Sequence, residues 1–234
     1  MDVRVISIGA LAAHPLWGER APVRTGHATT TLISTEARRV LVDPGLPTQA
    51  LVARLSERAN LMPRDITDVF LTSFHPENRR GLLAFENAKW WIHAPERESV
   101  GVALAQRVRA MKTGEGIEAG GGHDQELLHA LQQDIAILQR CEAAPDDLAP
   151  RVALFPLPGI TPGLAGLLLE DLRHTTLICG DALPTIEHLE QGKVLSPAAS
   201  VDQARSSFEE ALEIADLLIL GRDNMVVNPT KRPF

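Results

Sequence analysis

Residues 71–81 read LTSFHPENRRG, a polar stretch that begins at the last residue of the apolar run VFL at 69–71. A short apolar run of this kind is typical of a buried strand. The polar side chains that follow it are Ser73, His75, Glu77, Asn78, Arg79 and Arg80. Imidazole and carboxylate groups at the end of a strand are candidate metal ligands. The alternative interpretation is a polar loop in which Glu77 or Asn78 caps a short helix at 79–87.

Three further apolar runs pass into polar residues in the same way. The motifs are VDPG at 42–45, LICGDA at 177–182 and LILGRDN at 218–224. The side chains that they place at strand ends are Asp43, Asp181, Arg222 and Asp223. A single aspartate of this kind is most simply a turn residue. Four strand ends together predict that the polar side chains converge on one edge of the sheets, where Asp181 and Glu77 are the candidate catalytic carboxylates.

Together with PLPGITPGLAG at 156–166, these motifs resemble the metallo-β-lactamase fold superfamily. They occur in the order of that family and span nearly the whole chain. The resemblance implies an α/β (α+β) fold, a four-layer αββα sandwich in which two sheets pack together with helices outside. It also implies a hydrolase that acts on esters, amides, thioesters or phosphoesters through a metal-activated water.

Most of the family's metal ligands are replaced in this chain. The segment at 72–78 is similar to the family's Thr-His-x-His-x-Asp-His. Its first histidine is Ser73 here, its second is retained as His75, its aspartate is Glu77 and its third histidine is Asn78. Serine is a weak ligand, so His75 is the one imidazole that this motif supplies.

The remaining ligand positions lie in the second half of the chain. The histidine of the family's Pro-Gly-His-Thr-Pro-Gly turn is Ile160, and the last histidine, expected after Gly221, is Arg222. The bridging aspartate is retained as Asp181. Isoleucine cannot bind a metal, and a guanidinium has no lone pair to offer one. Beside Asp181 and Glu77, Arg222 would repel a divalent cation and could take its place.

The first hypothesis is therefore that an Arg222–Asp181 ion pair replaces the metal centre. The chain would then bind no metal, and its remaining pocket would bind a small molecule or a protein partner. The rival hypothesis is a mononuclear hydrolase in which His75, Glu77 and Asp181, with Asp223 nearby, hold one divalent metal such as zinc, iron or manganese. A third class, a structural or oligomer-forming protein, would follow if side chains such as Ile160 filled the pocket.

Three further histidines bear on this site. His27 precedes a predicted strand and is included among the pocket residues. His14 lies in a loop that could cover the site, and His188 is expected in a loop after Asp181.

Composition and charge indicate which classes of binding partner to expect. The chain has 234 residues and a formal net charge of −7. An acidic chain gives no electrostatic attraction for nucleic acid or an anionic membrane, so neither is expected. No run approaches the roughly 18 apolar residues of a membrane span, and the N-terminus does not resemble a signal peptide. We therefore expect a cytoplasmic protein whose two cysteines form no disulfide framework, and oligomerisation stays open.

Hydrophobic periodicity predicts strands, then helices, then strands and a last helix. The predicted strands are 3–8, 29–34, 39–42, 69–71, 89–93, 152–155, 166–170, 175–179 and 217–220. The predicted helices are 48–59, 79–87, 96–113, 125–140 and 201–214. The glycine-rich segment at 114–124 is predicted to connect two of these helices. We expect one domain over residues 1–234 with a helical insert at about 96–140.

Overall fold

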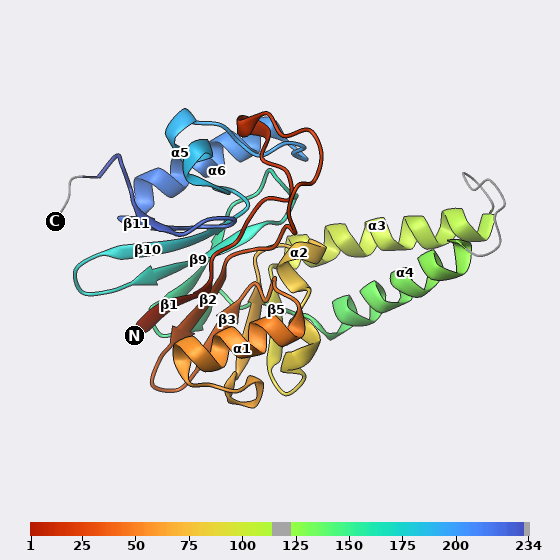
Figure 1. Ribbon diagram of the computed structural model, residues 1–234, viewed down its shortest axis with the longest axis horizontal. Coiled ribbons are helices and arrows are strands. Elements are labelled where there is room, and N and C mark those ends of the chain that lie inside the picture. The colour runs from red at the N-terminus through yellow and green to blue at the C-terminus, as the bar shows by residue number, and fades with distance from the viewer. Residues whose placement is uncertain (114–122, 232–234) are drawn as a thin grey trace.

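The computed structural model describes residues 1–113 and 123–231 and forms a four-layer αββα sandwich (Figure 1). This is the architecture that the sequence predicts. Two six-stranded sheets face each other, with helices on their outer faces. A pair of long helices extends away from the sandwich at one side (Figure 1).

The first sheet runs in chain order from β1 to β6. Its strands are β1 (Asp2–Ser7), β2 (Thr30–Ser34), β3 (Arg39–Val42), β4 (Asp68–Leu71), β5 (Lys89–Ile92) and β6 (Glu142–Ala143). The pairs formed by β1, β2 and β3 are antiparallel, and those from β3 to β6 are parallel. The carboxyl ends of β3 and β4 therefore lie at the same edge of the sheet.

The second sheet has the order β12-β11-β10-β9-β8-β7. Its strands are β7 (Asp147–Ala149), β8 (Val152–Pro156), β9 (Ala165–Glu170), β10 (Thr175–Gly180), β11 (Leu217–Leu220) and β12 (Met225–Val227). Strands β10 and β11 are parallel, and the other pairs are antiparallel. The carboxyl ends of β10 and β11 are therefore neighbours, which matters for the site.

The helices divide between the outer layers and the arm. The α-helices are α1 (Thr48–Ala59), α2 (Pro76–Arg79), α3 (Ala94–Thr113), α4 (His123–Arg140), α5 (Ile186–Gln191) and α6 (Val201–Ile214), and the short 3₁₀ turns are η1 (Pro15–Trp17), η2 (Pro63–Asp65) and η3 (Leu82–Phe85). Helix α1 buries Leu51 and Leu55, which are one turn apart and face the first sheet. Helix α6 buries Phe208 and Ala211 against the second sheet.

The core between the sheets is built from aliphatic and aromatic side chains, most of them on strands. Val42 and Phe70 of the first sheet and Leu167 and Ile178 of the second belong to one buried cluster. Each of them is at most 3 % exposed. Both cysteines, Cys141 and Cys179, are buried free thiols.

Several local predictions need correction. The helix predicted at 79–87 is wrong, because the chain instead forms α2 and η3 with a break at Arg80 and Gly81. His75, not Glu77 or Asn78, caps α2 by accepting a hydrogen bond from the Glu77 backbone N–H. His188 lies in helix α5 and is 1 % exposed, where a loop was expected. The chain also forms the short strands β6, β7 and β12, which the hydrophobic pattern did not predict.

The two helices predicted at 96–113 and 125–140 are present as α3 and α4. Residues 114–122, the first nine of the predicted connector, lie outside the described residues, and the last two, His123 and Asp124, begin α4. In the part of the chain that the structure describes, no helix combines the length and the apolar character needed to cross a membrane.

Candidate functional site

The polar strand ends meet where the two sheets open toward α2. Asp181 directly follows β10, which ends at Gly180. Arg222 follows β11 after one further residue, Gly221. A Cβ at Gly221 would lie 2.3 Å from the carbonyl oxygen of Gly180. Only glycine permits this approach of the two backbones, and it brings the side chains of Asp181 and Arg222 together.

Arg222 is the centre of the cluster, and its side chain is 2 % exposed. Its Nε and Nη2 donate to the two carboxylate oxygens of Asp181 at 2.7 and 2.8 Å. Its Nη1 donates to Glu77 Oε2 at 2.6 Å, and Nη2 also donates to Asn78 Oδ1 at 3.0 Å. The ion pair that the sequence predicts between Arg222 and Asp181 is thus present, in the bidentate geometry that matches guanidinium to carboxylate.

Thr72 connects this cluster to Asp43. The Thr72 backbone N–H and hydroxyl donate to the two oxygens of Asp43 at 2.9 and 2.6 Å. Asn78 Nδ2 donates to Thr72 Oγ1 at 3.0 Å. A chain of buried hydrogen bonds therefore runs from Asp43 through Thr72 and Asn78 to Arg222.

Burial and neighbouring charges act in opposite directions on these groups. Burial would raise the pKa of Asp181, but Arg222 lowers it below the ordinary value. Burial would lower the pKa of Arg222, but Asp181 and Glu77 raise it. The pKa of Asp43 is raised to about 7, because burial outweighs its hydrogen bonds from Thr72. Asp181 and Arg222 are therefore a charged pair, whereas Asp43 can hold a proton near neutral pH.

His75 lies at the exposed side of the cluster. Burial of part of its ring, followed by the charge of Arg222, lowers its pKa. Its Nδ1 accepts from the Glu77 backbone N–H at 3.3 Å. Ser73 is buried, and its Oγ accepts from the His75 backbone N–H at 3.4 Å. Both residues therefore stand beside the Arg222 cluster and shape its loop.

Three predicted pocket residues lie apart from the Arg222 network. Asp223 accepts hydrogen bonds from the backbone N–H groups of Ile186 and Asn224, so it holds the start of α5. Ile160 packs against the apolar cluster beneath α6. The His27 ring nitrogens lie 3.2 and 3.1 Å from the carbonyl oxygens of Thr25 and Ile8.

A small cavity of about 140 Å³ opens next to Arg222. Its lining residues are Gly9, Ala10, Leu11, His14, Trp17, Arg24, Thr185, Glu187, Arg222 and Asp223. His14 stacks on Trp17 with ring centroids 4.1 Å apart. Its Nε2 lies 3.1 Å from both Thr185 Oγ1 and Glu187 Oε2. The N-terminal loop is thereby attached to α5 and forms one wall of the cavity.

Sequence reasoning missed Thr72, Thr185 and Glu187. Thr72 directly follows a strand, and a threonine at such a position gives no sign that it connects Asp43 and Asn78 by hydrogen bonds. A signal for α5 was present, because Thr185 precedes it and Gly192 follows it at the spacing of a short helix. That helix would have placed Glu187 and His188 on a folded element opposite His14.

The residues at the site do not fit the metal centre that the family resemblance implies. The guanidinium of Arg222 occupies both oxygens of Asp181 and one oxygen of Glu77. It offers no lone pair, and its positive charge lies where a divalent cation would need carboxylate oxygens. Over residues 1–113 and 123–231, no three His, Cys, Asp or Glu side chains are grouped as ligands of one metal ion.

Comparison with known proteins gives a family and several related folds. The family model described as "Metallo-beta-lactamase superfamily" matches residues 23–221. No curated protein sequence matches this chain.

Several solved structures have a similar fold. One is AidC, a dizinc quorum-quenching lactonase in complex with a product, with a TM-score of 0.66 and 19% identity over 88% of this chain and 76% of that one. Another is an AiiA variant from B. thuringiensis with N-decanoyl-L-homoserine bound at the active site, with a TM-score of 0.57 and 20% identity over 86% and 85%. The hydrolase AbOPH has a TM-score of 0.61 and 12% identity over 88% and 80%. At these identities the likeness shows the fold alone.

Proposed function

This chain belongs to the metallo-β-lactamase superfamily, and we propose that it uses an arginine–carboxylate cluster in place of the metal centre that the family resemblance implies. In this proposal the chain binds a small polar molecule in the cavity beside Arg222. The observation that carries the proposal is the guanidinium of Arg222, which binds Asp181 and Glu77 while almost fully buried.

The charges support this assignment. Two carboxylates drawn out of water need a counter-charge, since an unpaired buried ion costs several kcal/mol by general estimates. In the family that charge comes from metal. Here Arg222 supplies it permanently, because a guanidinium stays protonated at any physiological pH. A metal ion that activates a water would have to compete with this guanidinium for the same carboxylate oxygens.

The cavity suggests what kind of ligand the site takes. Its volume of about 140 Å³ is well below the roughly 300–1,000 Å³ of sites for drug-sized ligands. The charged side chains that line it already have partners within the protein: Arg24 pairs with Glu19, and Arg222 pairs with Asp181 and Glu77. Glu187 lies against His14, and Asp223 accepts from backbone N–H groups. We therefore expect a small, neutral or zwitterionic polar molecule, and no large acyl or aromatic substrate.

A mononuclear metal hydrolase using His75, Glu77 and Asp181 is the second candidate. One observation favours it: the lowered pKa of His75 keeps its imidazole neutral, which is the form that binds a metal. This function requires Arg222 to leave both carboxylates.

Metal analysis of untagged protein, purified without chelator, separates the two functions. We expect no stoichiometric metal in the native protein by mass spectrometry, and no change in melting temperature on adding a chelator. The Arg222→His variant removes the guanidinium and restores an imidazole beside Asp181, so we expect it to take up zinc. Arg80→His, which adds a histidine at an exposed position outside the cluster, is the matched control and should take up none.

About one metal ion per native chain, with chelator-sensitive stability, would overturn the proposal and support the mononuclear hydrolase. Ligand binding needs a separate test, in which small neutral and zwitterionic compounds are screened by thermal shift. Compounds that stabilise the native protein should fail to stabilise Ala10→Leu, because the larger side chain fills the cavity that Ala10 lines.

A further inference from the structure

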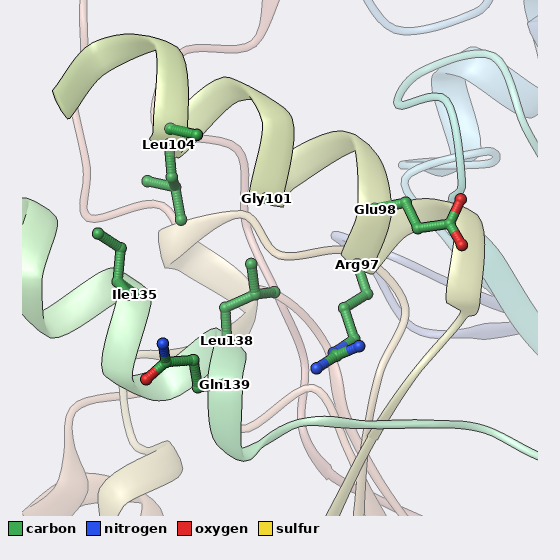
Figure 2. A pocket seen from close by; sticks show the side chains of 8 residues that line it. Arg97, Glu98, Gly101, Leu104, Ile135, Leu138 and Gln139 are labelled. Carbon is green, nitrogen blue, oxygen red and sulfur yellow. The ribbon is translucent and has the colours of Figure 1, made fainter. Parts of the chain in front are cut away.

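A second and larger cleft lies between α3 and α4, away from the Arg222 cluster (Figure 2). Its volume is about 350 Å³. Its lining residues are Arg97, Glu98, Gly101, Leu104, Ala105, Ile135, Leu138 and Gln139. Leu104 of α3 points down into it, and Ile135 and Leu138 of α4 point up (Figure 2). The walls are therefore mainly apolar.

Gly101 keeps the cleft open in the middle of α3. Glycine inside a helix destabilises it relative to alanine, so a close contact usually explains its presence. None is found here, because a Cβ at Gly101 would meet only Leu138 Cδ2, at an ordinary distance of 3.8 Å. Helix packing does not require this glycine. Its missing side chain instead leaves room between the helices.

The polar end of the cleft carries a positive charge. Arg97 extends along the lower side of the cleft beside Leu138, whereas the carboxylate of Glu98 points away from it (Figure 2). Across the described ranges, the Arg97 guanidinium forms no ion pair or side-chain hydrogen bond. An apolar cleft with an uncompensated cation at one end is complementary to a molecule that has an apolar chain and an anionic end.

The size of the cleft favours a small molecule over a protein. A stable protein interface uses about 20–30 residues on each side, and this cleft is lined by only eight. Its volume lies within the roughly 300–1,000 Å³ of small-molecule sites.

We propose that the cleft between α3 and α4 binds an elongated apolar molecule with an anionic end group, such as a carboxylate, whose charge pairs with Arg97. This site is independent of the function proposed for the Arg222 cluster, and either can fail without the other.

Calorimetric titration of the intact protein with decanoate, decan-1-ol and decyltrimethylammonium, all below micelle formation, tests the proposal. We expect saturable binding of decanoate at one site. Arg97→Gln should lower the affinity for decanoate at least tenfold and leave the affinity for decanol unchanged, because only the charge pairing is lost. Arg107→Gln, on an exposed part of α3 outside the cleft, is the matched control.

A second pair of variants tests the location. Gly101→Leu should abolish binding of both decanoate and decanol, because its side chain fills the cleft. Ala103→Leu adds the same side chain at an exposed position of α3 outside the cleft. This variant should bind both compounds as the native protein does. If Gly101→Leu does not fold, Ala105→Met fills the cleft from its rim.

Several outcomes would overturn the proposal. Decanoate that does not bind, or that binds Gly101→Leu as tightly as the native protein, excludes the cleft as its site. Equal binding of decyltrimethylammonium, or no effect of Arg97→Gln, excludes recognition of the anionic end. A protein that dimerises through α3 and α4 without binding any amphiphile would assign the cleft to a second copy.

Discussion

Asp43 shows how a single buried residue can make the stability of this site depend on pH. It is 2 % exposed, and its carboxyl oxygens accept hydrogen bonds from the backbone N–H and the hydroxyl of Thr72. Burial raises its pKa from 3.8 to about 7. Between those values the folded chain holds a proton that the unfolded chain has released. Stability contributed by Asp43 is therefore full below about pH 4 and is lost as the pH rises toward 7.

We expect Asp43→Asn to remove this dependence. Asparagine cannot titrate, and its amide oxygen can still accept from the Thr72 backbone N–H. Between pH 5 and pH 8 the native protein should lose about 2–3 kcal/mol more stability than the variant, because only about two of the pH units that separate the two pKa values lie in this range, and each is worth ~1.4 kcal/mol. Urea unfolding at several pH values measures it. Asp146→Asn, at an exposed position, should follow the native protein. Parallel pH profiles for native protein and Asp43→Asn would contradict the raised pKa.

The contacts of a single residue could be predicted from the sequence where the side chain can take part in only a few kinds of interaction. Arg222 beside a retained Asp181 could be predicted as an ion pair, because a guanidinium cannot act as a ligand and carboxylates need a cation. The His14–Trp17–Glu187 wall of the cavity could not, because His14 and Glu187 are 173 positions apart and either residue is ordinary in a loop. The raised pKa of Asp43 depends on burial, which a strand-end aspartate does not reveal.

Among the elements, the base of α3 is attached directly to the site. Glu96, in the first turn of α3, is 1 % exposed. Its carboxylate accepts from the Phe74 backbone N–H at 3.0 Å, from Thr161 Oγ1 at 2.6 Å and from the Gly163 backbone N–H at 3.2 Å. One side chain thus joins α3, the 71–81 loop and the turn that contains Ile160.

We expect Glu96→Ala to destabilise the protein by about 2–5 kcal/mol, because it leaves buried donors from two other segments without an acceptor. Glu98→Ala removes a carboxylate of the same kind from an exposed position in the same helix and should change stability by less than about 0.5 kcal/mol. Urea unfolding followed by circular dichroism compares the two. A Glu96→Ala cost as small as that of Glu98→Ala would mean that water replaces the three hydrogen bonds.

The elements also show which sequence signals were reliable. Helices α1 and α6 and strands β10 and β11 follow clear apolar periods and were predicted almost to the residue. The helix predicted at 79–87 failed because its polar residues serve tertiary contacts. Arg79 donates to the Phe74 carbonyl oxygen and pairs with Asp134 of α4. These tertiary contacts of the site loop override the helical propensity of residues 79–87.

On the scale of the whole molecule, a larger fraction of the side chains is buried in the two sheets than in the α3–α4 arm. Strands such as β4 and β10 are buried along almost their full length. In the arm, residues 125–130 are all exposed, and the buried apolar side chains in the described part of the two helices are Leu104, Leu131 and Leu138. Local stability follows buried apolar contacts, so the arm has less to lose on opening than the sandwich.

We therefore expect the outer half of the arm to unfold without the sandwich. Native-state hydrogen exchange should show the amides of 102–111 and 125–131 exchanging at free energies well below that of global unfolding, whereas those of β4 and β10 exchange only through global unfolding. Leu131→Ala, which removes one of these buried side chains, should speed exchange in the arm and leave exchange in β10 nearly unchanged. Val201→Ala, at an exposed position of α6, should alter neither. If the arm and β10 exchanged at one common free energy, the arm would be a cooperative part of the sandwich, and a ligand bound between α3 and α4 would stabilise the whole chain to the same extent as the arm itself.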